Sequence, residues 1–254
     1  MHTVLDAALA FLLDNFPTVR EGLTGGPLAL AWAAGCLHLA GWLKRSKDWK
    51  TGYTRKVFHF LIFASAAAVH VLWGTRGVCL FGAMTSAVVF YAVWRGAGHS
   101  LYEALAREKD APHRSYFILA PWFATLAGGL AANLFAPTAS PVGYLVTGLG
   151  DALAEPVGTR FGRHEYTVPA LVGVRSTRSL EGSAAVFLAS TLAIAAGVLL
   201  SPALALGPHG LWMAPLLGLV CALLEAVSPH GWDNAVLQIV PSLLAMKLFA
   251  GGAS

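Results

Sequence analysis

The sequence predicts an all-α integral membrane protein, a polytopic bundle of about eight transmembrane helices. Of its 254 residues, 56% are apolar and only 12% are charged, whereas soluble globular domains average about 45–50% and about 25%. Long apolar runs recur along the whole chain, separated by glycine, proline or clusters of charge. No polar stretch between them is long enough to fold separately, so we expect residues 1–254 to form a single domain.

Eight spans have the length that a membrane-crossing helix needs, about 20 mostly apolar residues. Lipid offers no partner to an open backbone polar group, so we expect each span to be helical. The fifth span, PVGYLVTGLGDALAEPVG, is the least hydrophobic. In chain order the spans are approximately 27–43, 57–73, 77–94, 116–135, 141–158, 183–200, 209–227 and 234–250.

The N-terminal 22 residues stand apart from these spans. Their segment VLDAALAFLLDNF is short and carries Asp6 and Asp14. A short, partly charged apolar helix suits the membrane surface, so we predict an interfacial or partly inserted helix within residues 1–22 rather than a ninth span. The segment lacks a basic start and a small-residue cleavage site, so it does not read as a signal peptide.

Lysine and arginine predict the orientation. The connections after spans one, three and five hold fourteen of the seventeen basic residues. Cytoplasmic loops carry the excess of Lys and Arg, so we expect these connections, and the one after span seven, to face the cytoplasm, with a bacterial inner membrane favoured. The net charge of +4 follows from this topology and calls for no nucleic-acid partner. The fourteen are Lys44, Arg45, Lys47, Lys50, Arg55, Lys56, Arg95, Arg107, Lys109, Arg114, Arg160, Arg163, Arg175 and Arg178.

Two carboxylates interrupt the fifth span. Asp151 and Glu155 are four residues apart, so on a helix they share one face and repel each other. An ionised Asp at the centre of a transmembrane helix costs about 2.5–3.5 kcal/mol. Compensation could come from Arg160 and Arg163, from a divalent cation or from protonation. A structural ion pair near the membrane surface is the alternative, but we favour a functional site because intramembrane carboxylates are functional by default.

The segment RSTRSLEGSAAVF, residues 175–187, combines positive charge with a helix start. Ser179 is a candidate N-cap, and Glu181 suits the first turn of the following helix. Capping does not account for Arg175 and Arg178, which lie where the helix dipole disfavours positive charge. Together with the hydroxyls and Gly182, these arginines form a candidate anion cradle.

Three further stretches on the cytoplasmic side carry polar residues. VGTRFGRHEYTVPALVG is a basic, glycine-rich connection in which glycines would let backbone N–H groups approach a phosphate. In TRKVFHF, Lys56 and His59 are three residues apart and can converge on one helix face. In EAVSPHGWDNAV, Asp233 could cap a helix, but capping does not explain Glu225 inside an apolar segment.

All these clusters are therefore expected at one membrane face. Carboxylates supply the hard oxygen ligands that Mg²⁺ prefers, and cationic side chains supply donors to phosphate oxygens. The sequence predicts phosphoryl- or nucleotidyl-transfer chemistry at the cytoplasmic surface, on a substrate whose tail lies in the bilayer. The candidate metal ligands are Asp151, Glu155, Glu181, Glu225 and Asp233.

The motif GDALAEPVGTRFGRHEY, followed by RSLEGSAAVF, resembles the signature of the polyprenol kinase family, which includes dolichol, phytol and farnesol kinases and a yeast-type diacylglycerol kinase. RKVFH near the start and E...GWDN near the end also resemble elements of that family, so the resemblance spans about residues 55–236. Family members are CTP-dependent kinases of lipid alcohols. Arg178 stands where many relatives would have Lys, which keeps the charge but alters the geometry.

The resemblance implies a role for each candidate residue. Asp151 would bind Mg²⁺ or orient the substrate hydroxyl, with Lys56 and His59 completing the catalytic group and His59 the second choice for handling the hydroxyl proton. The partners implied are CTP and a lipid alcohol in the bilayer. The nucleotide would be held by Gly158, Arg160, Gly162, Arg163, Arg178, Ser179, Gly182 and Ser183.

Two rivals to a kinase remain open. A CTP-using lipid cytidylyltransferase would also need metal, arginines and a membrane substrate, although its usual HGG...DR..D signature is absent. An ion-coupled transporter would have carboxylates but no evident need for the basic, glycine-rich loop. The sequence leaves open whether the acceptor is phytol, farnesol, geranylgeraniol, a polyprenol or diacylglycerol, and it does not determine the oligomeric state.

Overall fold

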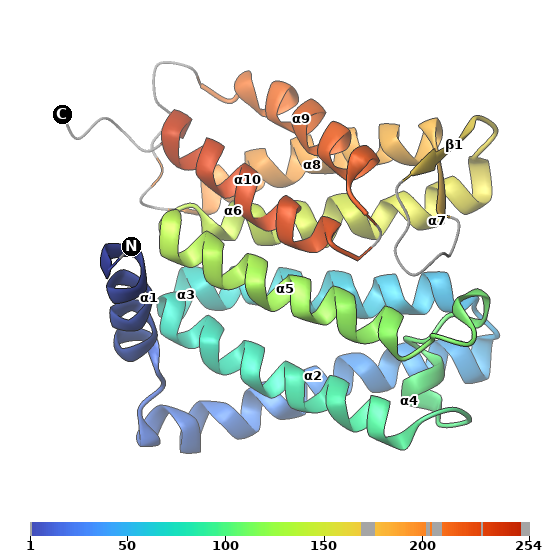
Figure 1. Ribbon diagram of the computed structural model, residues 1–254, viewed down its shortest axis with the longest axis horizontal. Coiled ribbons are helices and arrows are strands. Elements are labelled where there is room, and N and C mark those ends of the chain that lie inside the picture. The colour runs from blue at the N-terminus through green and yellow to red at the C-terminus, as the bar shows by residue number, and fades with distance from the viewer. Residues whose placement is uncertain (1, 169–175, 202–203, 205–209, 230, 250–254) are drawn as a thin grey trace.

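A computed structural model describes residues 2–168, 176–201, 204, 210–229 and 231–249 of the chain. Helices make up nearly all of this part, and they run mostly along one axis (Figure 1). A 3₁₀ turn at Glu108–Asp110 and a π-helical turn at Thr147–Asp151 interrupt them. The α-helices are α1 (His2–Asn15), α2 (Val19–Lys47), α3 (Thr51–Arg95), α4 (Ser100–Glu103), α5 (Tyr116–Phe135), α6 (Ser140–Val146), α7 (Ala152–Phe161), α8 (Leu180–Leu200), α9 (Met213–Val227) and α10 (Asp233–Phe249).

The helices have the character of a membrane bundle. Among the described residues, α2, α3, α5 and α8 are long and apolar enough to cross a membrane. Large apolar side chains also face outward. On α8, for example, Leu188, Leu192 and Leu199 are 60%, 69% and 64% exposed. An outer surface of this kind is costly in water and stable in lipid. The structure therefore supports the predicted fold class, a helical membrane bundle.

Within the described residues each of the eight predicted spans overlaps a helix, although their number as membrane crossings stays a prediction. The second and third spans lie within α3, whose 45 residues bend at Gly74. The φ of Gly74 is 67°, a left-handed conformation that glycine adopts without steric cost. The fourth span coincides with α5, and the fifth corresponds to the continuous run α6, π turn and α7.

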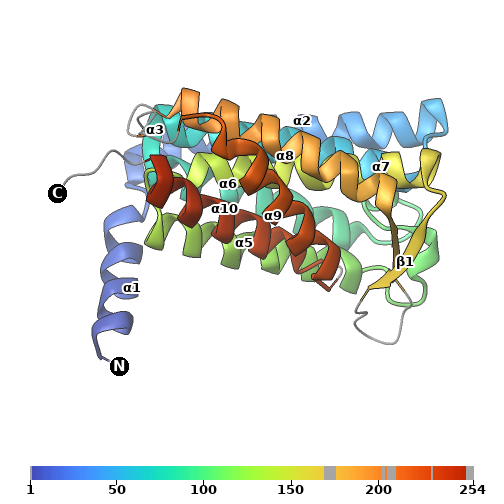
Figure 2. The same ribbon diagram turned by 90° about the horizontal axis from the view of Figure 1, so that it is seen from above.

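The N-terminal helix α1 is separate from α2 and runs across the axis of the bundle (Figure 2). Its location at the membrane surface stays a prediction. A capping box divides the two helices, because the Thr18 hydroxyl accepts a hydrogen bond from the backbone N–H of Glu21 while the Glu21 carboxylate accepts from that of Thr18. The cap starts α2 eight residues before the apolar span predicted at 27–43.

A two-stranded antiparallel sheet, β1 (Glu165–Val168) and β2 (Ser176–Ser179), is the one departure from the all-α prediction among the described residues. Its register pairs Glu165 with Ser179 and Tyr166 with Arg178. The glycine-rich, basic sequence predicted only a loop here. Arg175, expected in the anion cradle, lies outside the described residues.

Small residues bring the central helices into close contact, as is common in membrane bundles. A Cβ on Gly143 of α6 would lie 2.2 Å from the backbone oxygen of Gln238 in α10, and one on Gly197 of α8 would lie 2.9 Å from Val142. The α6–α7 run is therefore held between α10 and α8. The α2–α3 and α9–α10 turns, the connection bearing α4, and the sheet all lie at one end of the bundle (Figure 1).

Candidate active site

The π-helical turn positions the first carboxylate. Its residues, TGLGD, end at Asp151, whose side chain is buried within the bundle. Glycine is required here by close packing: a Cβ on Gly148 would lie 2.8 Å from Cβ of Phe63, and one on Gly150 would lie 2.5 Å from Oγ of Ser190. Single π turns within helices occur often at functional sites, and this one directs Asp151 toward α3.

Asp151 is held by two side chains from α3. The Lys56 ammonium donates a 2.6 Å hydrogen bond to Oδ2 of Asp151, and Nε2 of His59 lies 3.2 Å from the same oxygen. Nε2 also lies 3.0 Å from the backbone oxygen of Thr147. Both neighbours of Nε2 are acceptors, so this nitrogen must carry the proton. His59 therefore donates toward Asp151 and is not a base at that atom.

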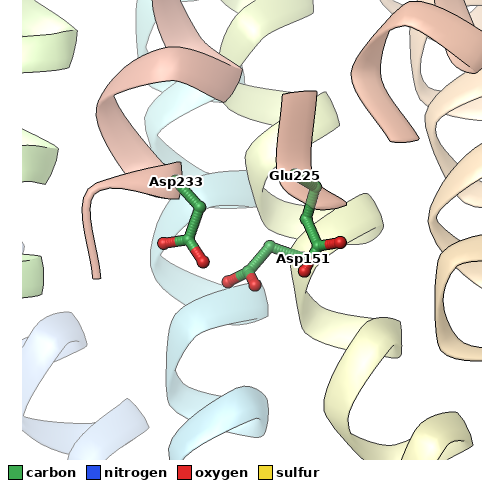
Figure 3. Close-up of side chains that lie close together, drawn as sticks. All are labelled: Asp151, Glu225 and Asp233. Atoms are coloured by element: carbon green, nitrogen blue, oxygen red, sulfur yellow. The ribbon is translucent and has the colours of Figure 1, made fainter. Parts of the chain in front are cut away.

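Two further carboxylates converge on Asp151. Asp151, Glu225 and Asp233 come from the π turn, α9 and α10, and their side chains point toward one another (Figure 3). One carboxylate oxygen from each lies within 4.8 Å of the others, and all three residues are buried. Within the described part of the chain, these three residues form the one cluster of three or more possible ligands that is close enough to hold a metal ion.

One arginine of β2 bridges two of these carboxylates. Nη1 of Arg178 lies 3.0 Å from Oε1 of Glu225, and Nη2 lies 2.9 Å from Oδ2 of Asp233. Lys56 and Arg178 thus supply two positive charges against three buried carboxylates, leaving one excess negative charge when all are ionised. Hard oxygen ligands with excess negative charge suit Mg²⁺ or a similar divalent cation, so the donor set fits such an ion.

Glu155 belongs to a second charged group. Its carboxylate lies 3.1 Å from Nη1 of Arg107 and 3.5 Å from Nη2 of Arg55. Arg107 also forms a two-bond ion pair with the buried Asp110, at 2.8 and 3.1 Å. The sequence predicted Glu155 to be a metal ligand, whereas the structure places it among arginines. Its neighbour Arg107 was counted only as a basic loop residue, and no sequence feature distinguishes it from the others of that loop.

Glu181 is also placed apart from the three grouped carboxylates. Its Oε1 lies 2.8 Å from Nδ1 of His164, whose side chain is 71% exposed. The expected cap beside it is present, because the Ser179 hydroxyl accepts a hydrogen bond from the backbone N–H of Gly182. The five carboxylates proposed as one metal set therefore divide into a group of three and two ion-paired residues.

A polar cavity of about 540 Å³ lies directly beside the three carboxylates. It extends from Lys56 and Asp151 past Glu155 toward α7 and β2, with the exposed Lys109 also on its wall. Six of the eight residues predicted to bind the nucleotide line this cavity, namely Gly158, Gly162, Arg178, Ser179, Gly182 and Ser183.

The other two predicted nucleotide ligands, Arg160 and Arg163, are exposed and do not line the cavity. Arg160 instead lies over the ring of Phe161, 5.4 Å from its centroid. The cavity glycines also have a packing role. A Cβ on Gly162 would lie 2.3 Å from the backbone oxygen of Gly158 and 2.9 Å from Oγ of Ser179, the N-cap of α8, so α7 ends tightly against the start of α8. That packing accounts for the glycine without reference to a phosphate.

Another ion pair, between Arg114 and Glu103, supports the connection between α4 and α5. Arg114 donates two hydrogen bonds to the Glu103 carboxylate, one of 2.5 Å, and another to the backbone oxygen of Ala106. The Arg114 hydrogen bonds hold the pKa of Glu103 below its usual value of 4.5. This pair stabilises the segment that carries Arg107 into the cavity wall.

Comparison with known proteins adds no relative. No family model, no curated protein and no solved structure matches the chain. The geometry of the site must therefore carry the functional argument.

Proposed function

We propose that this protein is a CTP-dependent kinase that phosphorylates the hydroxyl of a membrane lipid alcohol at the cytoplasmic face. One observation carries the proposal: three buried carboxylates, Asp151, Glu225 and Asp233, converge beside Lys56 and Arg178 on the wall of a polar cavity. A metal–polyphosphate complex needs such carboxylates for the metal and such cations for the phosphates. The choice of CTP rests on the resemblance to polyprenol kinases.

The cavity has the size and polarity for the nucleotide. Its volume, about 540 Å³, falls in the range of small-molecule sites, roughly 300–1,000 Å³. Arg178, the N-terminus of α8 and Lys109 would face the phosphates, because each offers positive charge or N–H donors to the cavity. Arg160 and Arg163 remain candidates only for attraction of the anion from outside, because they are exposed.

Mg²⁺ would be held by Asp151, Glu225 and Asp233, and it would neutralise phosphate charge during transfer. Phosphoryl transfer has a loose transition state, so positioning and charge neutralisation matter more than a strong base. Lys56 and His59 fix the Asp151 carboxylate, which then orients the acceptor hydroxyl. Glu155, through Arg55 and Arg107, fixes the wall on the other side of the cavity.

The proposed orientation places this end of the bundle in the cytoplasm. The basic connections gather there, as the positive-inside rule requires of cytoplasmic loops. CTP is a cytoplasmic metabolite that does not cross the bilayer, so a site using it must open on that side. In this proposal the chain crosses the membrane eight times, and α1 lies at the opposite surface.

Product analysis tests the proposal. Purified protein in lipid vesicles is incubated with CTP, Mg²⁺ and a lipid alcohol such as geranylgeraniol, and the nucleotide products are separated. We expect CDP and a phosphorylated lipid, with no turnover when EDTA removes the metal. Pyrophosphate release would identify a cytidylyltransferase instead. Absence of any nucleotide consumption, across CTP, ATP and the full panel of alcohols, would contradict both activities.

A further inference from the structure

A second, smaller pocket adjoins the polar cavity from the membrane side. It has a volume of about 120 Å³ and lies between α3, α5 and the start of α10. Figure 1 shows α5 in the middle of the bundle, between α10 and α3. Lys56, Asp151 and Asp233 line both spaces. The pocket therefore meets the polar cavity at two of the three clustered carboxylates, Asp151 and Asp233.

The rest of the lining mixes apolar side chains with polar ones, and the polar ones are Arg55, His59, Thr85, Thr125 and Asn234. Ile62 and Val89 of α3 and Ile118 and Trp122 of α5 are among the apolar ones. Trp122 reaches toward the lipid-facing surface, because its ring packs on Phe90, which is 44% exposed. The pocket thus runs from two buried carboxylates to Trp122, whose ring packs on the exposed Phe90.

From this arrangement we propose that the pocket binds the acceptor, and that the acceptor is an alcohol with a single aliphatic chain. The inference rests on the proposed kinase function and specifies its second substrate. The hydroxyl would lie beside Asp151, facing the phosphate in the polar cavity, and the chain would leave between α3 and α5 into the lipid.

Size decides against a two-chain acceptor. An apolar cavity of about 150 Å³ binds one benzene molecule, so 120 Å³ admits the first few carbons of one chain. Diacylglycerol would bring a glycerol backbone and two ester groups next to its hydroxyl. A branch point with two chains needs more room beside Asp151 than a space of about 120 Å³ provides.

The transfer step balances without another reactant. The alcohol oxygen forms a bond to the γ-phosphorus of the nucleotide, and the bond from that phosphorus to the bridging oxygen of the diphosphate breaks. The hydroxyl proton is released to solvent through the polar cavity. The products are the alkyl monophosphate and the nucleoside diphosphate.

Two measurements test the pocket. First, a single-chain alcohol with a photoreactive diazirine near its hydroxyl is irradiated with the intact protein in vesicles, and the labelled peptides are identified. We expect label in residues 116–125 of α5 or 58–63 of α3, competed by geranylgeraniol and not by diacylglycerol. Label spread over the outer surface, or competition by diacylglycerol to the same degree, would overturn the inference. This measurement needs no turnover, so it is separable from failure of the proposed kinase activity.

Second, Val89→Phe fills the pocket and is compared with Val71→Phe, a matched change at a half-exposed position of the same helix. We expect Val89→Phe to raise KM for the alcohol by about tenfold or more, with KM for CTP unchanged, since one methylene group in such a pocket is worth about 10–200-fold. Val71→Phe should leave both constants unchanged. An unchanged KM for the alcohol in folded Val89→Phe would overturn the inference while leaving the kinase activity standing. If Val89→Phe does not fold, the labelling of the wild-type protein decides.

Discussion

At the scale of single residues, the site depends on opposite charges that are buried together. Asp151 lies 2.6 Å from the Lys56 ammonium, and Arg178 lies about equally close to Glu225 and Asp233. Buried pairs of this kind contribute little net stability, but removing one partner leaves an uncompensated charge. To separate a catalytic effect from a structural one, a mutation that removes one charge is therefore compared with a double mutation that also removes its partner.

Replacing Asp151 tests the central assignment. Asp151→Asn should lower kcat by about a thousandfold, because the variant enzyme loses several kcal/mol of charge stabilisation in the transition state. It should also lower Tm, since breaking a buried ion pair costs about 3–5 kcal/mol. The double variant Asp151→Asn/Lys56→Met removes both charges and should regain much of the Tm without regaining turnover. Recovery of turnover with Tm would show that Asp151 is only structural.

Arg178 should behave as a ligand of the nucleotide. Arg178→Ala should raise KM for CTP and lower kcat, by about 10–100-fold in kcat/KM, because a hydrogen bond to a charged group is worth about 1.5–3 kcal/mol. Arg178→Lys keeps the charge and should recover part of the activity. Steady-state kinetics with parallel melting curves measure both effects. Normal kinetics combined with a lower Tm in Arg178→Ala would make the residue structural.

The Glu103–Arg114 pair predicts a dependence of stability on pH. Because Arg114 lowers the pKa of Glu103 in the folded protein, the pair stabilises the fold above the unfolded-state pKa, near 4.5. That contribution is lost as pH falls through the lower, folded-state pKa. Wild type should therefore melt above Glu103→Gln at pH 7, and the difference should shrink below about pH 4.5. A difference in Tm that stays constant down to pH 3 would contradict this origin.

At the scale of elements, the π turn and its glycines place Asp151. A regular α-helix through residues 147–151 would rotate the carboxylate away from Lys56, and side chains at Gly148 or Gly150 would separate α6 from α3 or α8. The strand β2 has a comparable role, since it carries Arg178 across to α9 and α10. The backbone geometry of the π turn and of β2 thus brings Asp151 and Arg178 to the site.

The π turn should tolerate no added side chain. Gly148→Ala should lower both Tm and kcat, because overpacking costs about 1–3 kcal/mol and any relief shifts Asp151. Gly82→Ala in α3 is the matched control: a Cβ there meets nothing within 4 Å, and alanine favours a helix over glycine by about 1 kcal/mol. Its Tm should stay equal or rise, with kcat unchanged. Equal behaviour of the two variants would refute the packing argument.

At the scale of the whole molecule, charge and apolar surface are arranged along one axis. The basic connections lie at one end of the bundle, and α1 lies at the other (Figures 1 and 2). The large apolar side chains between them face outward. This distribution is what a bilayer perpendicular to the bundle axis would select.

Labelling of single cysteines tests the orientation. Cys36, Cys79 and Cys221 are first replaced by serine, and one cysteine is then introduced at position 47, 109, 165, 76 or 138. A membrane-impermeant maleimide added to intact cells should label positions 76 and 138 only. In inverted vesicles it should label positions 47, 109 and 165. Labelling of position 165 in intact cells would reverse the proposed orientation and place the site away from CTP.

The sequence by itself determined the class of the protein and the chemical character of its site. Hydrophobic runs and the distribution of lysine and arginine are local properties, so they predicted the helical bundle and the end where charge gathers. The start of α2 was also encoded locally, in the Thr18–Glu21 capping box, although hydropathy alone missed it. The sequence nominated Asp151, Lys56 and His59 as candidates, and the structure brings the three together.

Only the tertiary structure decided which charges meet. Asp151 meets residues 74 and 82 positions later in the chain, while Glu155, one helical turn from it, pairs with Arg107 instead. The π turn rotates Asp151 relative to a regular helix, so the spacing of four residues did not place the two carboxylates in one site. The acceptor pocket is equally non-local, since its walls come from α3, α5 and α10. Partners across such separations are chosen by helix packing, which no local pattern of residues specifies.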